Sequence, residues 1–283
     1  MAARIIETVP EMQNSSERLR LEKKTLALVP TMGSLHRGHA ALIERARALA
    51  DVVVVSIFVN PTQFAPNEDY ARYPRDLAHD TTIAEAAGAD IIFHPAATEM
   101  YSPAASTYVT VEEVSKLFEG EFRPIHFRGV ATVVAKLFNI VKPHVAVFGQ
   151  KDAQQAFIIQ KMVRELNFDV RLEIVPIVRE ADGLAMSSRN AYLSNDERKR
   201  ALVLSQSLMK ASEKISAGER DLERLRMELQ KSIQSGQPTG IDYVAFIDPQ
   251  TFQPTAVFPA QGLLIALAVR FGATRLIDNI LIL

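Results

Sequence analysis

The sequence predicts a doubly wound parallel α/β sheet followed by a second, smaller α+β domain. Five short apolar runs rich in β-branched residues recur before residue 176, and amphipathic helical patterns separate most of them. This alternation is typical of a parallel sheet with helices on both faces. After Arg189 the pattern changes to long, charged helical segments and three further strands. We therefore expect two domains, residues 1–183 and residues 184–283.

The elements of the first domain follow from their apolar spacing. Strands are predicted at 25–29, 52–59, 89–93, 145–148 and 170–175. Helices, with apolar residues three and four positions apart, are predicted at 40–50, 76–87, 130–141 and 153–166. The segment 130–141 is apolar nearly all round, so we expect it to be buried.

The second domain begins with two charged helical patterns, at 195–217 and 219–235, which end at a Gly-Gln-Pro-Thr-Gly breaker. Strands are predicted at 242–247, 263–269 and 274–281. We expect these strands to form an antiparallel sheet.

Composition limits the classes of function. The chain has 283 residues, of which 48% are hydrophobic and 23% charged, and its net charge is −1. This balance argues against broad binding to nucleic acid or anionic membranes but leaves room for a local basic pocket. No cysteine is present, which excludes disulfides and a thiol nucleophile. Neither a signal peptide nor an apolar run of about 18 residues appears, so a cytoplasmic location is expected.

The most informative stretch is Pro-Thr-Met-Gly-Ser-Leu-His-Arg-Gly-His at 30–39, between a predicted strand and a predicted helix. Unpaired N–H groups at a helix N-terminus attract anions. Gly33 and Gly38 would let phosphate approach the backbone, while His36 and His39 could stabilise charge on a phosphorus under attack. We predict a nucleotide-phosphate site here.

A helix cap and a metal site are the alternatives for the same stretch. A lone histidine here would be explained most simply as a cap, but two histidines flanking a glycine favour function. A closed zinc site is disfavoured, because the chain lacks cysteine and no other ligands cluster nearby.

Polar residues also follow other predicted strands, at the edge where a doubly wound sheet binds its ligands. Asn60 and Gln63 carry amides that could fix a hydroxyl or carboxylate of a small substrate. A proline turn is the simpler explanation of this segment.

The segment Gly-Gln-Lys-Asp-Ala-Gln-Gln at 149–155 follows the strand at 145–148. Its glycine would permit close approach of a nucleotide to the backbone. Lys151 could bind phosphate, and Asp152 could bind ribose hydroxyls. The alternative is that Asp152 caps a helix while Lys151 is solvated.

The segment 179–190 contains Ser187, Ser188 and Arg189, which could clamp phosphates from a mobile loop. Its place at the domain junction favours a closing lid. Alternatively, the serines cap a short turn, and Arg179 with Glu180 forms a surface ion pair.

Three further groups carry less weight. The segment 123–129, Arg-Pro-Ile-His-Phe-Arg-Gly, could add positive charge to the same cleft. Glu68 and Asp69 could place Mg²⁺ through water, although a solvated acidic loop is the simpler explanation. The remaining histidines, at 79, 94 and 144, are assigned structural roles.

Neither a Walker A loop nor a G-x-G-x-x-G fingerprint is present, which disfavours P-loop phosphotransfer and dinucleotide redox chemistry. The reaction class that remains is attack on the α-phosphorus of a nucleoside triphosphate.

Taken together, the segments 30–39, 58–64, 126–130, 148–155 and 179–190 resemble the pantoate–β-alanine ligase (pantothenate synthetase) family. The His-x-Gly-His element alone is shared with nucleotidylyltransferases and class I aminoacyl-tRNA synthetases. The terminal Thr-Arg-Leu-Ile-Asp-Asn at 274–279 also resembles this family.

The resemblance implies a Rossmann-like, nucleotidylyltransferase-type fold and condensation of pantoate with β-alanine for coenzyme A biosynthesis. ATP would be cleaved to AMP and pyrophosphate through an enzyme-bound pantoyl adenylate, with Mg²⁺. It also implies a homodimer whose partners are small molecules, with no nucleic acid and no membrane.

The resemblance also assigns residues by motif position. His39 is the implied catalytic acid, with His36, Lys151, Ser187, Ser188 and Arg189 sharing the charge of the transition state. The implied ATP contacts are Met32, Gly33, Ser34, Leu35, His36, Arg37, Gly38, His39, Gly149, Gln150, Lys151, Asp152, Val178, Met186, Ser187, Ser188 and Arg189. The implied substrate contacts are Gln63 for pantoate and β-alanine, Gln155 for pantoate, Asn60 and Met32. Metal ligands are not assigned.

Two departures from the family pattern are slight: Gln150 stands where glutamate is common, and Ala153 where tyrosine is frequent. Two other functions stay open. One is a nucleotidylyltransferase that leaves AMP on its acceptor, and the other is a nucleotide-binding regulatory module without turnover.

Overall fold

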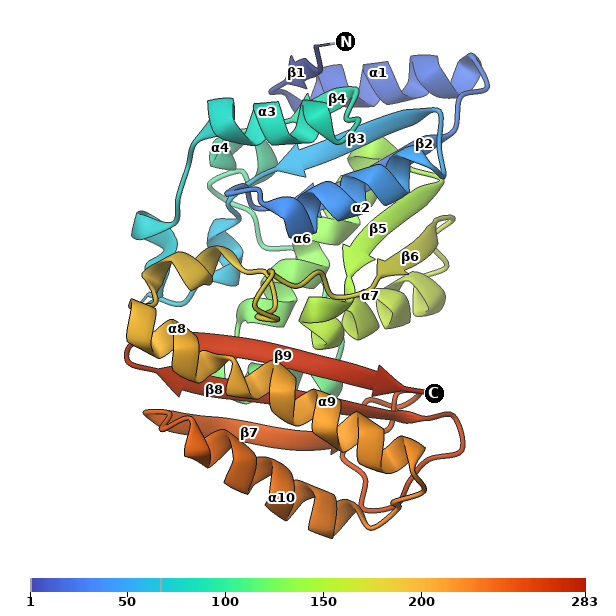
Figure 1. The fold of residues 1–283 in the computed structure, drawn as a ribbon. Helices are drawn as coiled ribbons and strands as arrows, with labels where there is room; N and C mark the ends of the chain where they lie inside the picture. Colours follow the sequence, from blue (N-terminus) through green and yellow to red (C-terminus); the bar gives the residue numbers. More distant parts are fainter. Residues whose placement is uncertain (1, 67) are drawn as a thin grey trace. The chain divides into compact units, whose positions relative to one another are not determined.

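The computed structural model describes residues 2–66 and 68–283, and its backbone contacts divide the chain into two units (Figure 1). Unit 1 contains the described residues up to Gln150, together with Gln154–Pro176. Unit 2 contains Lys151–Ala153 and Ile177–Leu283. Residues 177–183, which the sequence analysis assigns to the first domain, thus group with unit 2.

Unit 1 is built on a six-stranded parallel sheet, which confirms the predicted fold class. Its strands are β1 (Arg4–Ile6), β2 (Leu26–Thr31), β3 (Val52–Ile57), β4 (Ile91–Phe93), β5 (Val145–Gly149) and β6 (Arg171–Val175). Their order is β1-β4-β3-β2-β5-β6, so the chain reverses its direction of growth between β2 and β5. In such sheets a ligand binds beyond the carboxyl ends of the strands at this switch point.

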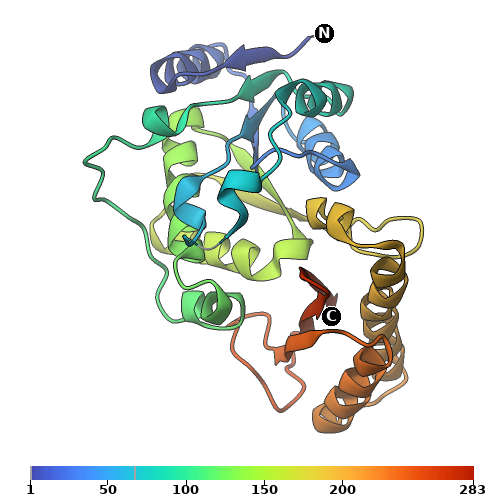
Figure 2. The same ribbon diagram turned by 90° about the vertical axis from the view of Figure 1, so that its left-hand side faces the viewer.

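Helices flank the sheet of unit 1 (Figures 1 and 2). They are α1 (Val9–Leu21), α2 (Arg37–Arg47), α3 (Leu77–Ala86), α4 (Ala97–Met100), α5 (Glu119–Phe122), α6 (His126–Val141) and α7 (Ala153–Glu165). Ile43 of α2 packs in one core cluster with Val29 and Val55. Residues alternate between the faces of a strand, so Leu28, which is also fully buried, points to the opposite face.

The helix predicted at 130–141 is buried as expected, since 13 residues of α6 are buried. It begins at His126, and α2 begins at Arg37, both earlier than predicted. The early start of α2 follows from its cap, because His36 accepts a backbone hydrogen bond from Gly38 and so replaces the usual serine or aspartate.

Two elements at the start of the chain, β1 and α1, were not predicted. The strand is only three residues long. The buried positions of α1 are Met12, Ser15 and Ser16, so two hydroxyl side chains stand where an apolar stripe would reveal a helix.

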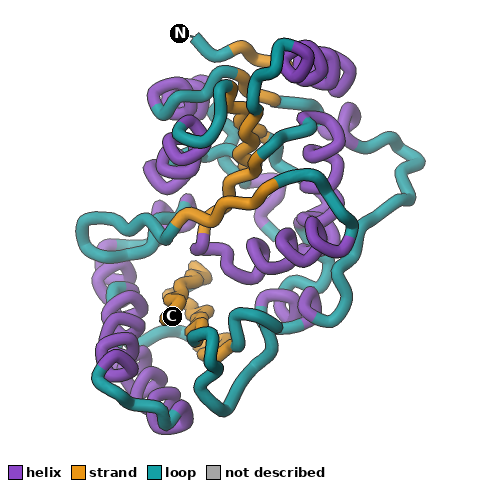
Figure 3. Tube along the Cα trace, turned by 90° about the vertical axis from the view of Figure 1, so that its right-hand side faces the viewer, coloured by secondary structure: helices purple, strands orange, loops and turns teal. Residues whose placement is uncertain are grey.

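Unit 2 contains a three-stranded antiparallel sheet in the order β7-β8-β9, as predicted. The strands are β7 (Gly240–Ile247), β8 (Leu263–Phe271) and β9 (Thr274–Ile282), and the helices are α8 (Asn195–Ala201), α9 (Val203–Ser216) and α10 (Leu222–Ser235). The strands of this unit and the helices beside them are distinguished by colour in Figure 3. Leu208 of α9 and Leu229 of α10 share a core cluster with Phe246 and Leu267.

The segment 195–217 was predicted as one helix but is interrupted at Leu202. That residue keeps helical dihedral angles, φ −59° and ψ −22°, so the interruption is local. No helix in the described ranges, 2–66 and 68–283, is both long and apolar enough to cross a membrane.

Candidate active site

The turn between β2 and α2 is held by a buried carboxylate. Gly33 and Ser34 have positive φ angles, +85° and +52°. Asp80 of α3, which is 1% exposed, accepts hydrogen bonds from the N–H groups of Ser34 at 2.9 Å and Leu35 at 2.6 Å. A Cβ atom at residue 33 would lie 2.8 Å from Asp80 Oδ2, so the close approach requires glycine. No motif in the sequence marks Asp80 as part of this site.

Other N–H groups of the turn also have partners inside it. Gly33 donates to Thr31 Oγ1 at 3.2 Å, His36 to His39 Nδ1 at 3.3 Å, and Gly38 to His36 Nδ1 at 3.1 Å. The prediction that unpaired backbone N–H groups attract phosphate is therefore wrong for this turn. A partly buried turn needs partners for its own amides, so an anion here must be met mainly by side chains.

These bonds determine the tautomers of both histidines. Because Nδ1 of His36 and Nδ1 of His39 accept backbone N–H groups, each neutral ring carries its proton on Nε2. The ring centroids are 4.1 Å apart. The turn thus provides two adjacent Nε2–H donors at the carboxyl end of β2.

The carboxyl end of β3 leads into a short helix, η1 (Pro61–Gln63). Asn60, which is 1% exposed, donates from Nδ2 to Gln63 Oε1 at 3.0 Å and to the Gly129 carbonyl oxygen at 3.2 Å. Its own Oδ1 accepts the N–H and the hydroxyl of Thr62. Asn60 therefore fixes the orientation of the Gln63 amide: Oε1 faces Asn60, and Nε2 points to the other side.

The segment 123–129 also supports η1. Arg123 Nη2 and His126 Nδ1 both bond to the Gln63 carbonyl oxygen, at 3.3 Å and 3.1 Å. Arg123 also forms an ion pair with Glu68 at 2.6 Å. A Cβ atom on Gly129 would lie 2.3 Å from a backbone oxygen of η1. This segment thus positions Gln63, and Glu68 balances the positive charge that Arg123 was expected to add.

A partly buried tyrosine lies beside η1. The Tyr101 hydroxyl is 3.4 Å from Thr62 Oγ1. Burial raises the pKa of the Tyr101 phenol, and hydrogen bonds with Thr62 and Asn60 only partly oppose this effect. The phenol therefore stays protonated near neutral pH.

The two adjacent glutamines of α7 differ in exposure. Gln154 is buried, and its amide bonds to Val114 O, Leu117 O and Glu119 N, each within 3.1 Å. Gln155 is only partly buried. Of this pair, Gln155 suits a substrate, as the sequence analysis expects, and Gln154 supports the neighbouring loop.

Two of the histidines assigned structural roles hold strands in place. His144 Nδ1 accepts the N–H of Leu26 at 3.0 Å, and burial lowers the pKa of this imidazole. His94 Nδ1 bonds to the carbonyl oxygen of Ile57 at 2.8 Å.

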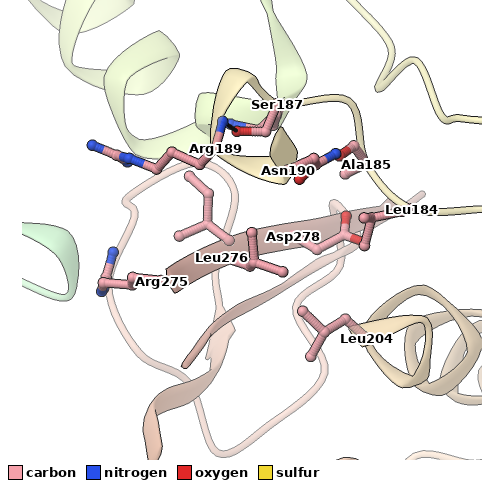
Figure 4. Close-up of a pocket in the computed structure, with 11 residues that line it drawn as sticks. Leu184, Ala185, Ser187, Arg189, Asn190, Leu204, Arg275, Leu276 and Asp278 are labelled. Atoms are coloured by element: carbon pink, nitrogen blue, oxygen red, sulfur yellow. Dashed lines mark hydrogen bonds between the residues drawn. The ribbon is translucent and has the colours of Figure 1, made fainter. Parts of the chain in front are cut away.

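Unit 2 brings a second set of predicted residues together. A pocket is lined by Lys151, Ser187, Arg189, Arg275 and Asp278, among others. The guanidinium groups of Arg189 and Arg275 lie on the same side of the view (Figure 4). Arg275 pairs with Asp242 at 2.6 Å and Lys151 lies 3.6 Å from Asp152, so the positive charge of the pocket is partly balanced within unit 2. The remaining charge would suit an anionic ligand.

The hairpin before Ser187 is held by ion pairs other than the expected one. The alternative that Arg179 pairs with Glu180 is wrong, because Arg179 forms two bonds with Asp278, at 2.7 Å and 3.0 Å. Glu180 instead pairs with Arg198 at 2.7 Å. Ser187 Oγ does accept the N–H of Arg189, so the predicted serine cap is present.

The predicted site residues therefore fall into two groups. Unit 1 holds 32–39, Asn60, Gln63, Gly149, Gln150 and Gln155, and unit 2 holds Lys151, Asp152, Val178, Met186, Ser187, Ser188 and Arg189.

A histidine-bearing strand–turn–helix at the switch point of a doubly wound sheet defines a nucleotide-binding α/β enzyme of the nucleotidylyltransferase type. The comparisons with known proteins narrow this class. The profile of a family described as pantoate–β-alanine ligase matches residues 4–281. The chain belongs to this family.

Curated relatives agree over nearly the full length. A pantothenate synthetase from Chloroherpeton thalassium is 53% identical over 278 residues, which are 98% of each chain. One from Thermotoga petrophila is 54% identical over 276 residues, again 98% of each chain.

Solved structures agree as well. A pantothenate synthetase from Thermus thermophilus has a TM-score of 0.92 at 45% identity and covers 98% of both chains. A pantoate–β-alanine ligase from Francisella tularensis, complexed with β-γ ATP and β-alanine, has a TM-score of 0.79 at 31% identity, over 99% of this chain and 98% of that one. The predicted family, fold class and ligase activity are confirmed.

Proposed function

We propose that this ligase joins pantoate to β-alanine through an enzyme-bound pantoyl adenylate, with ATP as the source of the adenylyl group. The observation that carries this proposal is the pair of Nε2–H donors at His36 and His39, at the edge of the sheet where a nucleotide binds. The Francisella relative, solved with β-γ ATP and β-alanine, supports the same two ligands here.

In the first step a pantoate carboxylate oxygen attacks the α-phosphorus, and the bond from this phosphorus to the oxygen bridging to pyrophosphate breaks. The imidazoles would donate hydrogen bonds to phosphate oxygens as charge develops. Since Nδ1 of His39 accepts a backbone N–H, Nε2 is the atom from which His39 would act as the catalytic acid that the resemblance implies.

Pyrophosphate would be stabilised by the cations Lys151 and Arg189 and by the hydroxyls of Ser187 and Ser188, all in unit 2. We therefore assign unit 2 the role of a lid. Val178, Met186 and Gly149–Asp152 would complete the contacts to ATP.

Mg²⁺ would enter with the nucleotide. Among residues 2–66 and 68–283, no group of three acidic or histidine side chains is placed to hold a metal. Glu68, a candidate from the sequence, pairs with Arg123. Mg²⁺ is commonly bound through substrate phosphates with few protein ligands, which fits this chain.

In the second step the amine of β-alanine attacks the acyl carbon, and AMP leaves. Gln63 would present its Nε2 donor to pantoate, and Gln155 would hold pantoate from α7. Correct placement and exclusion of water are the main requirements, because hydrolysis of the mixed anhydride competes.

The test is mass analysis of products after incubation with ATP, Mg²⁺ and pantoate, with and without β-alanine. We expect pantothenate and AMP only when β-alanine is present, and trapped pantoyl adenylate without it. A stable, released adenylated acceptor would favour the nucleotidylyltransferase alternative, and no pantoate-dependent cleavage of ATP would favour the regulatory module.

We also infer a cytoplasmic homodimer, on the basis of the family resemblance. Light scattering should then give about twice the chain mass of 31.4 kDa. A single-chain mass at micromolar concentration would contradict the dimer.

A further inference from the structure

The terminal strand β9 carries a motif, Thr-Arg-Leu-Ile-Asp-Asn, to which the proposed mechanism assigns no role. Two consecutive polar residues of this motif, Asp278 and Asn279, are buried at 2% and 3% exposure. Buried polar side chains are costly unless they are hydrogen-bonded. Their partners therefore indicate what these residues are for.

Asp278 holds the hairpin that leads into Ser187. Its carboxylate accepts two bonds from Arg179 and one from the Asn279 N–H at 2.8 Å. Arg179 also donates to the Gly183 carbonyl at 3.2 Å, so the guanidinium bridges β9 and the tip of the hairpin. The hairpin closes where Met186 donates to Val178 O, one residue before Ser187.

Asn279 holds the other phosphate-directed segment. Its Nδ2 donates to the carbonyl oxygen of Lys151 at 3.0 Å, across 128 positions of sequence. Residues 151–153 group with unit 2, although Gln150 and Gln154 on either side belong to unit 1. The bond from Asn279 thus ties the main chain of Lys151 to the same unit as Ser187 and Arg189.

We propose that Asp278 and Asn279 are positioning residues that preassemble the pyrophosphate-binding half of the site in unit 2. One strand holds both the lysine and the serine–arginine segment, so their charges keep a set spacing before the nucleotide binds. Preorganised charge stabilises a transition state without further reorganisation. This inference rests on the proposed function.

The test compares the two half-reactions of Asn279→Ala. Pantoate-dependent exchange of pyrophosphate into ATP reports the first, and aminolysis of chemically prepared pantoyl adenylate by β-alanine reports the second. We expect kcat/KM for ATP in the exchange reaction to fall on the order of tenfold. A loss of this size corresponds to one lost hydrogen bond and the resulting displacement of Lys151. Aminolysis should stay near wild type, because pyrophosphate has already left.

Ser207→Ala is the matched control. Ser207 is 1% exposed and donates to Ser232 Oγ at 2.8 Å between α9 and α10, so its loss also removes a buried hydrogen bond from unit 2. It does not line the pocket. We expect it to lower the unfolding temperature without separating the two half-reactions.

Equal losses in both half-reactions of Asn279→Ala, or unchanged exchange, would overturn the proposal. If this variant does not fold, Asp278→Asn, which keeps the side-chain shape, should show the same selective loss, and equal losses there would count against the role. Wild-type protein without pantoate-dependent exchange would instead refute the adenylate mechanism.

Discussion

The turn of unit 1 and the cationic pocket of unit 2 are organised in opposite ways. In the turn, His36 and His39 are held by backbone groups within three residues of each ring. In the pocket, Lys151 is held by a residue 128 positions away, and Arg179 by one 99 positions away. A local motif therefore reveals the first set, whereas the second set depends on how the last strand packs.

The two regions also differ in charge. The turn offers imidazole N–H donors, while the pocket is lined by Lys151, Arg189 and Arg275. Hydrogen-bond donors act through geometry, so they should be sensitive to small displacements. Formal charges act over longer distances, so they should tolerate displacement better but weaken as salt is added.

The largest effect is expected at the turn itself. His39→Ala should slow formation of the adenylate by on the order of a hundredfold or more while ATP still binds, because one transition-state donor is lost. Single-turnover adenylation and equilibrium nucleotide binding measure the two quantities. His79→Ala, which removes an exposed histidine from α3, is the control and should match wild type. Near-wild-type adenylation by His39→Ala would contradict the assigned role.

The next effect concerns the support of the turn. Asp80→Ala leaves two N–H groups without their acceptor, each costing about 1–3 kcal/mol if it stays buried. We expect lower unfolding free energy in urea together with a raised KM for ATP. Asp51→Ala is the control, since Asp51 also accepts a backbone N–H, from Thr25, but is exposed. A lower unfolding free energy without a change in the KM for ATP would show that Asp80 supports the fold but not the nucleotide site.

A smaller effect should appear where Gln63 is positioned. In Gly129→Ala the new methyl group would sit 2.3 Å from the Thr62 carbonyl, so α6 or η1 must shift. We expect the KM for pantoate to rise roughly tenfold, as displacements below 1 Å cost less than a hundredfold. The KM for ATP should change less. Gly240→Ala, whose nearest neighbour atom would be 3.7 Å away, is the control. An unchanged KM for pantoate would argue that Gln63 does not bind it.

The smallest effect is electrostatic and belongs to unit 2. Burial raises the pKa of Asp242, but hydrogen bonds and charge from Arg270 and Arg275 outweigh it and hold this pKa below its usual 3.8. A lowered folded-state pKa contributes stability above the unfolded value, and this contribution is lost as the pH falls through the folded value. Asp242→Asn should thus cost about 1 kcal/mol or less at pH 6. Urea midpoints of the two proteins should converge toward pH 3, whereas a constant difference would contradict the ion pair.

Much of the fold could be predicted because its signals are local. The apolar strands of both units, the helix α6 and the histidine turn each occupy a short stretch with a recognisable period or motif. Among the elements that were missed, β1, α4 and α5 span only three or four residues. The helix α1 lacks such a period because Ser15 and Ser16 lie on its buried face.

The supports of the candidate site could not be predicted in this way. Asp80 is one acidic residue in a helical pattern, and no local feature distinguishes it from an exposed one. The segment with Arg123 and His126 was predicted to add positive charge to the cleft. Its structural role could not be predicted, because the partners Glu68 and Gln63 lie more than 50 residues away. The prediction of unpaired amides at the turn was wrong for the same reason. Two of these amides donate to Asp80 of α3, which lies more than 40 residues away.

The sequence by itself determined the order of strands and helices, the residue types at the ends of the strands and the family. These properties depend on side-chain period and on motifs within about ten residues. Only the tertiary structure decided that Asp80 supports the turn, which residues hold Gln63, and that β9 binds both Lys151 and the hairpin before Ser187. Hydrogen bonds between distant segments make these choices, because a buried polar group takes whichever partner the packed chain brings within about 3 Å of it.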